Sequence, residues 1–157
     1  MPQISPFLWF DGAAEEAARF YVAIFPNSRI TGVVLNGETS PGPTGLVMLV
    51  NFELDGQPVT ALNGGPQFRF NEAVSLVVHC EDQAQIDYYW DRLSLDGSTN
   101  VCGWLKDRYG LSWQVVPAEF MAMVQDPDPA RRDRVMDAMM LMTKFDLAKL
   151  REAFAGP

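Results

Sequence analysis

The sequence is poor in the side chains that most often bind metals or form disulfides. It contains a single histidine, His79, and only two cysteines, Cys80 and Cys102. One histidine excludes any site built on a pair of imidazoles, the arrangement found in many catalytic metal centres. Two cysteines in a chain without secretory features are expected to be reduced thiols rather than a disulfide.

Long hydrophobic runs and an excess of basic charge are also missing. No stretch of about 18 apolar residues occurs, so no membrane span is expected. The start of the chain, Met1 to Pro6, lacks the basic and apolar regions of a signal peptide, which favours a cytoplasmic location. The net charge of −8 repels phosphate backbones, so nucleic acid is not an expected partner. With 157 residues, 48% of them hydrophobic, the chain suits one globular domain.

The strongest positive signal is a repeat. Two segments carry apolar residues at the i, i+3, i+4, i+7 spacing of an amphipathic helix, the second 69 positions after the first. The first stripe consists of Ala17, Phe20, Tyr21 and Ile24, and the second of Ile86, Tyr89, Trp90 and Leu93. Asp11 and Asp82 precede these helices as candidate N-caps. A strand-like run precedes each cap, which favours duplication of a whole unit over a chance match.

Strand-like segments complete each half of the repeat. In the first half they are residues 4–10, 29–36, 46–54 and 58–63, and in the second 73–80, 98–100, 101–106 and 111–116. Each half therefore reads β-α-β-β-β, with Asp55-Gly56 as a hairpin turn signal. The predicted fold class is α+β: a single domain made of two βαβββ modules, 1–66 and 67–117, with a helical tail over 118–157.

The tail is expected to be helical and rich in methionine. The stretch 134–154 is predicted as one helix containing Met136, Met139, Met140 and Met142. Methionine is an adaptable residue of cores and interfaces. The apolar face of 135–154 is therefore a candidate interface, and a homodimer is expected.

Paired βαβββ units of this kind resemble the vicinal-oxygen-chelate superfamily, which includes glyoxalase I, bleomycin-resistance proteins and extradiol dioxygenases. More specific strings resemble its PhnB-like branch, often labelled a 3-demethylubiquinone-9 3-methyltransferase and generally without an assigned role. They are residues 10–17, 20–21, 25–28, 52–57, 61–66 and 102–114. The resemblance is expected to extend through the tail. It implies that each module curls its sheet into half a barrel and that the two modules form a cleft.

The resemblance also implies where a metal would be held, by four inward side chains from the first and last strand of each module. In this sequence those positions fall at Pro6, Thr60, Ser75 and Gln114. Proline offers no ligand, and neutral hydroxyls and amides bind iron, zinc or nickel poorly. Neither a catalytic metal nor another cofactor is expected. Thr60, Ser75 and Gln114 are instead candidates for ligand binding, since short polar groups fix a ligand's orientation.

Four further residues are candidates for the groove. His79 is the only side chain that ordinarily titrates near neutral pH, so it is a weak candidate general base or a hydrogen-bond partner; the alternative is a structural histidine bonded to a backbone carbonyl. Cys102, Trp104 and Lys106 alternate onto one face of a strand and could cradle an aromatic or anionic ligand. The alternative is a core Trp104 and a solvated Lys106.

Two functions follow, and the sequence does not decide between them. The first is a metal-free small-molecule-binding protein of the bleomycin-resistance type, with an unknown ligand. The alternative is a lyase, isomerase or oxidoreductase that uses His79, Lys106 or a weakly held divalent metal. The methionine-rich tail allows a third, a role through protein contacts. Methyl transfer is not expected, because Gly37, Gly42 and Gly45 lie in a proline-broken loop that leads into a strand rather than a helix.

Overall fold

The computed structural model describes residues 1–157, and its chain divides into two compact units, Met1–Phe70 and Asn71–Pro157. Each unit contains one four-stranded sheet and one long helix packed on it, and the second unit also carries three helices of the tail. The predicted α+β class, with two βαβββ modules and a helical tail, is confirmed. None of the helices is both long and apolar enough to cross a membrane.

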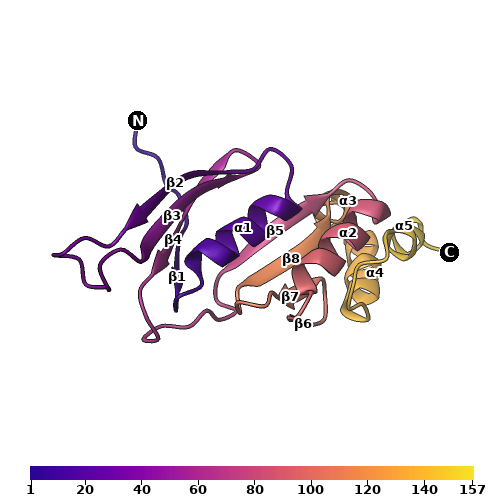
Figure 1. The fold of residues 1–157 in the computed structure, drawn as a ribbon. Coiled ribbons are helices and arrows are strands. Elements are labelled where there is room, and N and C mark those ends of the chain that lie inside the picture. The colour runs from indigo at the N-terminus through magenta and orange to yellow at the C-terminus, as the bar shows by residue number, and fades with distance from the viewer. The chain divides into compact units, whose positions relative to one another are not determined.

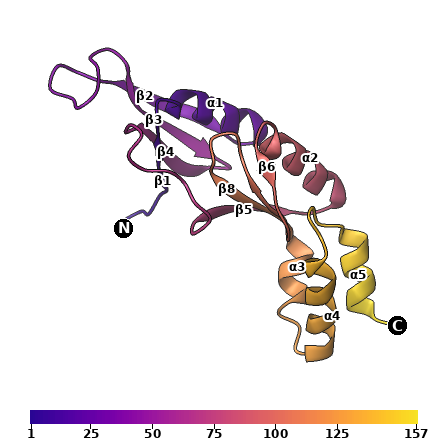
Figure 2. The same cartoon turned by 90° about the horizontal axis from the view of Figure 1, so that it is seen from below.

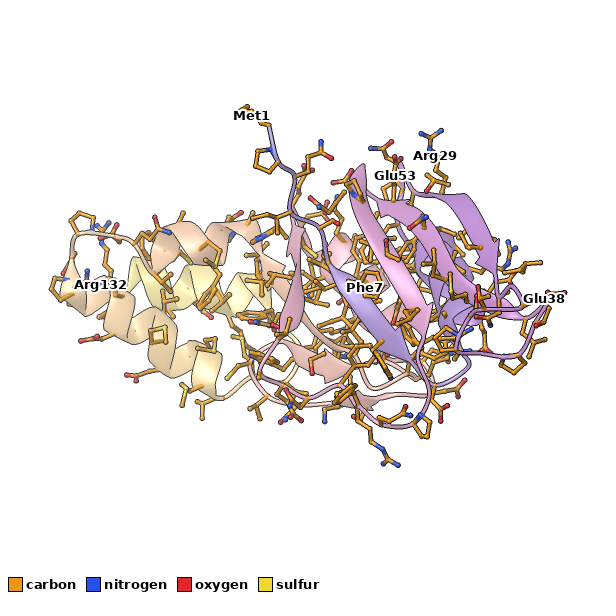
Figure 3. The ribbon with its side chains drawn as sticks, turned by 90° about the vertical axis from the view of Figure 1, so that its left-hand side faces the viewer. Met1, Phe7, Arg29, Glu38, Glu53 and Arg132 are labelled. Atoms are coloured by element: carbon orange, nitrogen blue, oxygen red, sulfur yellow. The ribbon has the colours of Figure 1, made fainter.

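The first unit contains a mixed sheet with strand order β1-β4-β3-β2. Its elements are β1 Phe7–Phe10, α1 Ala14–Ile24, β2 Arg29–Leu35, β3 Val47–Leu54 and β4 Gln57–Asn63. Helix α1 packs on β2, β3 and β4 (Figure 1). The edge strand β2 is tied to β3 by the ion pair between Arg29 Nε and Glu53 Oε2, 3.1 Å apart (Figure 3).

The second unit repeats this plan, with strand order β5-β8-β7-β6. Its elements are β5 Ser75–Cys80, α2 Gln83–Ser94, β6 Ser98–Thr99, β7 Trp104–Lys106 and β8 Ser112–Pro117. In each unit the first strand pairs in parallel with the last, and the other pairings are antiparallel. Equal strand order and equal strand directions in both units support duplication of one ancestral unit.

The helix stripes match position by position. Ala17, Tyr21 and Ile24 are buried, and so are their counterparts 69 positions later. Those counterparts are Ile86, Trp90 and Leu93. The remaining pair, Phe20 and Tyr89, is half-buried in both units. The repeat therefore sets which face of each helix packs against its sheet.

The strands do not follow the 69-residue offset. Phe10, the last residue of β1, lies four positions before the start of α1 at Ala14, whereas Cys80 lies only three positions before Gln83. The extra residue shifts the offset of the strands by one, so the counterpart of Ser75 is residue 5 rather than Pro6. The assignment of a metal-ligand position to Pro6 was therefore wrong. Pro6 precedes β1, and by strand alternation it belongs to the opposite face of the sheet from residue 5.

The two helices begin differently. Asp82 caps α2 as predicted, since its Oδ1 accepts a hydrogen bond from the Gln85 backbone N–H (2.8 Å). Asp11 does not cap α1, whose cap position is Ala13. Instead Asn63 of β4 supplies the acceptor: its Oδ1 accepts from the Ala14 N–H (2.9 Å), and its Nδ2 donates to the Val47 carbonyl (3.0 Å). A side chain distant in sequence thus satisfies a helix amide that has no partner within the helix.

A buried carboxylate organises the hairpin between β7 and β8. Asp107 is 3% exposed, and its two oxygens accept hydrogen bonds from the backbone N–H groups of Tyr109 and Leu111 and from Trp113 Nε1. A buried charge is stable only when several donors surround it. The sequence indicated only a turn over residues 107–110; the structure shows that Asp107 fixes the hairpin.

The tail forms three helices. The single helix expected over 134–154 is wrong, because this stretch is divided between two of them. The three helices are α3 Ala118–Met123, α4 Pro129–Met140 and α5 Leu147–Ala155, and they gather at one end of the second unit (Figure 2). The helix breaks after Met140 because the loop carbonyls of Met142 and Thr143 accept the N–H groups of Cys102 and Gly103 (both 2.8 Å). Met142 therefore lies in the connecting loop, where it is buried.

We predict that Asn63→Ala destabilises the protein by about 1–3 kcal/mol, because it removes two hydrogen bonds and leaves a partly buried helix amide without an acceptor. Asp11→Ala is the matched comparison, and its free energy of unfolding should stay within about 0.5 kcal/mol of the wild type. Urea denaturation followed by circular dichroism measures both. A larger loss for Asp11→Ala than for Asn63→Ala would show that α1 is capped from its own sequence.

Candidate functional site

One face of the second unit's sheet carries most of the residues expected to bind a ligand. The face opposite α2, called here the ligand face, presents Ser75, Val77 and His79 from β5, Trp104 and Lys106 from β7, and Ser112, Gln114 and Val116 from β8. Paired residues on neighbouring strands project to the same side of a sheet, so the registers place these side chains together. Of the residues expected in the groove, those on this face are Ser75, His79, Trp104, Lys106 and Gln114.

A cavity of about 300 Å³ opens on this face. Its walls are mainly apolar and aromatic, with three polar or titratable side chains among them. The lining residues are Val77, His79, Cys102, Trp104, Gln114, Val116, Phe120, Met121, Met139 and Phe145. This volume reaches the lower end of the range for small-molecule sites, which are typically about 300–1,000 Å³ and mostly apolar with a few placed polar groups.

The tail supplies four of these lining residues: Phe120, Met121, Met139 and Phe145. The contact is made possible by Gly103, whose φ is +78° and whose missing side chain leaves room for the Phe145 ring. Any Cβ at this position would also lie 2.8 Å from the Val115 carbonyl oxygen. Glycine is the residue that permits both the left-handed backbone and this close approach.

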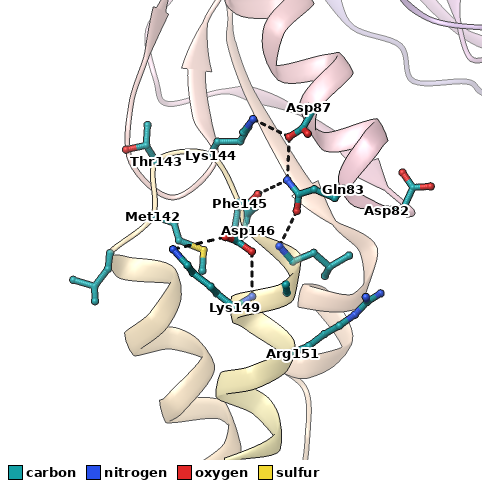
Figure 4. A pocket seen from close by; sticks show the side chains of 13 residues that line it. Asp82, Gln83, Asp87, Met142, Thr143, Lys144, Phe145, Asp146, Lys149 and Arg151 are labelled. Atoms are coloured by element: carbon teal, nitrogen blue, oxygen red, sulfur yellow. Dashed lines mark hydrogen bonds and ion pairs between the residues drawn. The ribbon is translucent and has the colours of Figure 1, made fainter.

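Gln83 anchors the tail from the first turn of α2 (Figure 4). Its Oε1 accepts from the Leu147 N–H (2.9 Å), and its Nε2 donates to the Phe145 carbonyl and to Asp87 Oδ1 (both 3.0 Å). Phe145 is 1% exposed as a result of this packing. The wall of the cavity is therefore fixed from two sides, by Gly103 on the sheet and by Gln83 on α2.

A larger hollow, of about 680 Å³, lies along the seam between α2 and the tail (Figure 4). Its charged side chains already pair with one another: Lys144 Nζ lies 2.8 Å from Asp87 Oδ1, and Lys149 Nζ lies 3.7 Å from Asp146 Oδ2. Arg151 pairs with Glu119. None of the residues expected to bind a ligand lines this hollow, so the smaller cavity on the ligand face is the better candidate despite its size.

Two of the expected polar residues bond to each other. Gln114 Nε2 donates to Ser75 Oγ at 2.9 Å, which presents the Gln114 side chain at the edge of the cavity. His79 also lines the cavity and is exposed. Both residues are therefore available to hydrogen-bond a ligand.

The structure separates the other expected residues. The prediction that Cys102 lies on one strand with Trp104 and Lys106 was wrong. Strand β7 begins at Trp104, and Cys102 occupies a left-handed turn with φ 59°. It nevertheless reaches the cavity, whereas Lys106 lines a separate hollow further along β7. Thr60 belongs to β4 of the first unit, where its hydroxyl donates to Asn51 Oδ1 at 2.8 Å.

The residues in the positions that would hold a metal do not suit one. Ser75 and Gln114 offer a hydroxyl and an amide that are already bonded to each other, and Thr60 offers a second hydroxyl. No group of three or more His, Cys, Asp and Glu side chains is placed where it could hold a metal ion. Divalent transition metals prefer imidazole, thiolate or carboxylate ligands.

Comparison with known proteins decides the family. The model of the family described as 3-demethylubiquinone-9 3-methyltransferase matches residues 2–116. The chain belongs to this PhnB-like family. No curated protein is significantly similar to it.

Solved structures agree with the family assignment. The PhnB protein from Bacillus cereus is 36% identical, with a TM-score of 0.68, and the match covers 74% of this chain and 100% of that one. A protein from Pseudomonas aeruginosa has the same fold at 20% identity and a TM-score of 0.62, covering 74% and 98% of the two chains. The fosfomycin resistance protein FosX from Mesorhizobium loti shares the fold at 13% identity and a TM-score of 0.54, covering 73% and 89%.

The match to the PhnB-like family does not include the tail. It ends at residue 116, so the expectation that the resemblance would extend through the tail was wrong. Helices α3, α4 and α5 all begin after that point. The sheet residues of the cavity therefore lie within the family match, and the tail wall lies outside it.

The two cysteines differ in accessibility, which gives a direct test of the cavity. Cys80 is fully buried, and burial, with a smaller contribution from Asp82, raises the pKa of its thiol to about 11. Only the thiolate reacts with aromatic disulfide reagents. We predict that one thiol of the native protein, Cys102, reacts at pH 8 and that the second reacts only on unfolding. Cys102→Ser should abolish the native reaction, and equal rates for both thiols would contradict the burial of Cys80.

Proposed function

We propose that the protein binds a small apolar or aromatic molecule in the cavity on the ligand face of its second unit and does so without a metal. One observation carries the proposal: a cavity of about 300 Å³ with apolar and aromatic walls and two accessible polar side chains, His79 and Gln114. Apolar walls supply affinity through the hydrophobic effect, and a few polar groups supply orientation.

The chemistry of the wall residues suits a binding role. Met121 and Met139 bring flexible thioether side chains that adapt to the shape of a ligand. Trp104 adds a flat, half-buried surface on which a ring can stack. We propose that the protein sequesters or senses this molecule.

The metal-free part of the proposal rests on the chemistry of Ser75, Gln114 and Thr60, which offer only neutral oxygen and amide donors. The family name suggests another activity, methyl transfer. Against it, the loop that contains Gly37, Gly42 and Gly45 joins β2 to β3 as a hairpin connection and does not lead into a helix N-terminus. It lacks the strand–loop–helix form that usually holds a methyl donor.

The second candidate function is an enzyme that uses His79. This residue is the only histidine of the chain, and it lines the cavity. Such an enzyme would use His79 as general base on the bound molecule, as a lyase, isomerase or oxidoreductase does. Lys106 and a weakly held divalent metal are the other groups that such chemistry would use.

The proposal includes a homodimer in the cytoplasm. Met136, Met140 and Leu141 remain exposed at the C-terminal end of α4, which supports self-association through the tail. Both cysteines are free, as in reducing compartments. Sedimentation equilibrium distinguishes a dimer from a monomer.

Filling the cavity should abolish binding of a neutral aromatic probe. Val77 lies on β5, lines the cavity and is 41% exposed, so an indole in its place would project into the space that a ligand occupies. We predict that Val77→Trp weakens the binding of 2-naphthylmethanol by more than about tenfold, a change of about 1.4 kcal/mol. Isothermal titration calorimetry gives both dissociation constants.

The matched control is Val74→Trp, because Val74 is exposed, lies just before β5 and does not line the cavity. Its affinity for the probe should equal that of the wild type. Both variants should keep their free energy of unfolding within about 0.5 kcal/mol, since the two sites are at the surface. Undiminished binding by Val77→Trp would place the probe elsewhere.

Metal titration of stripped protein tests the metal-free part directly. Zinc, nickel, manganese and ferrous ions should leave the melting temperature unchanged. A bound metal would instead stabilise the folded state by RT ln(1 + [L]/Kd), about 2.7 kcal/mol at a hundredfold excess over Kd. Tight one-to-one binding of any of these ions would overturn the metal-free proposal and favour metal-assisted catalysis.

A further inference from the structure

We propose that the molecule bound in the cavity is an amphipathic acid, with its apolar or aromatic body against the tail wall and one oxyanion group held by Lys106 and Ser112 on the other side of Trp104. A carboxylate has the size and charge that this second subsite fits. The inference rests on the proposed function, because it assigns a second point of contact to the same ligand.

A second hollow, of about 160 Å³, lies beside the cavity on the same unit. In contrast to the first, its side chains are mainly polar. It is lined by Glu72, Ser98, Thr99, Asn100, Trp104, Leu105, Lys106 and Ser112. Hydroxyl, amide and ammonium donors around a small space suit a compact anion rather than a hydrocarbon.

Ser112 provides the observation that points to a ligand. It is fully buried, it lines this hollow, and its Oγ has no hydrogen-bond partner. A buried hydroxyl without a hydrogen-bond partner is unfavourable, so a residue of this kind calls for a partner that the folded chain does not supply. The register places Ser112 directly opposite Lys106 of β7, and both residues line the same hollow.

A carboxylate already occupies part of this arrangement. Lys106 Nζ forms an ion pair with Glu72, whose pKa lies below its usual value mainly because of the hydrogen bond from Lys106. The Glu72 side chain is 59% exposed, so it can leave at little cost. Glu72 thus stands where the acid of a ligand would bind, and it competes with that acid for Lys106.

The two hollows are adjacent, because Trp104 lines both of them. Ser112 of the polar hollow and Gln114 of the apolar cavity lie two residues apart on β8 and face the same side, roughly 7 Å apart at about 3.3 Å per residue. One ring plus one or two bonds spans this distance. A molecule with an aromatic body and an acid group attached to it therefore satisfies both hollows at once.

Calorimetric titration with two ligands of the same body tests the inference: 2-naphthoate, which carries the acid, and 2-naphthylmethanol, which is neutral. The wild type should bind 2-naphthoate about tenfold more tightly, the contribution of one charge-assisted hydrogen bond. Lys106→Met and Ser112→Ala should each reduce this preference and leave the affinity for 2-naphthylmethanol unchanged. Glu72→Gln should increase the affinity for 2-naphthoate several-fold, because it removes the competing carboxylate.

Lys144→Met is the matched control. Lys144 is ion-paired to Asp87, and its side chain is 38% exposed, as is that of Lys106, but it lies on the seam between α2 and the tail. Its loss should leave the affinity for both ligands unchanged. An equal effect of Lys144→Met and Lys106→Met would mean that general charge attraction, not a subsite, selects the acid, and would overturn the inference.

The remaining outcomes separate this inference from the proposed function. If both ligands bind with equal affinity, or if Glu72→Gln weakens the binding of 2-naphthoate, the apolar cavity stands and the acid subsite is wrong. If neither ligand binds to the wild type, the proposed function fails and the acid subsite fails with it.

Discussion

The close approach of the Phe145 ring to the backbone of Gly103 is the constraint on which the candidate site depends. Gly103 adopts a φ of +78°, and its N–H and carbonyl bond to Thr143 and Val115, so the same residue joins the tail loop to β8. Any larger side chain would overlap the ring and the Val115 carbonyl. Together with the Gln83 hydrogen bonds, this contact holds the tail where Met139 and Phe145 line the cavity with Trp104. The cavity is thus a product of tail docking as much as of the sheet.

Duplication explains why one scaffold carries two different sets of polar contacts. By strand register, Thr60 opposite Phe7 is the counterpart of Gln114 opposite Val77. Thr60 bonds within its own sheet to Asn51, whereas Gln114 bonds to Ser75 and reaches the cavity. The same positions therefore carry a hydrogen bond within the sheet in one unit and a cavity-lining side chain in the other. The neutral side chains at these positions support the proposal of a metal-free binding protein.

Much of the fold could be predicted because it depends on patterns of residues that are close together in the sequence. The helix stripes and the Asp82 cap depend on residues close together in sequence, and they were found correctly. Contacts between distant segments could not be found that way. The acceptor at the start of α1 comes from Asn63, and the break after Met140 arises because the loop carbonyls bond to Cys102 and Gly103.

For the site, sequence alternation grouped Cys102 with Lys106, whereas a left-handed turn at Cys102 directs the two toward different hollows. The unpaired hydroxyl of Ser112 has no sequence signal at all.

The boundary of the family match bears on what the ligand is. The Bacillus cereus PhnB protein is matched over 100% of its length by 74% of this chain, and the family match ends at residue 116. The wall formed by Phe120, Met121, Met139 and Phe145 therefore adds apolar surface to a sheet that the family shares. Of the four wall residues, Phe120 and Met121 leave apolar surface accessible, whereas Met139 and Phe145 are almost fully buried. A name transferred from the family therefore describes the sheet and says nothing of the tail wall of the proposed site.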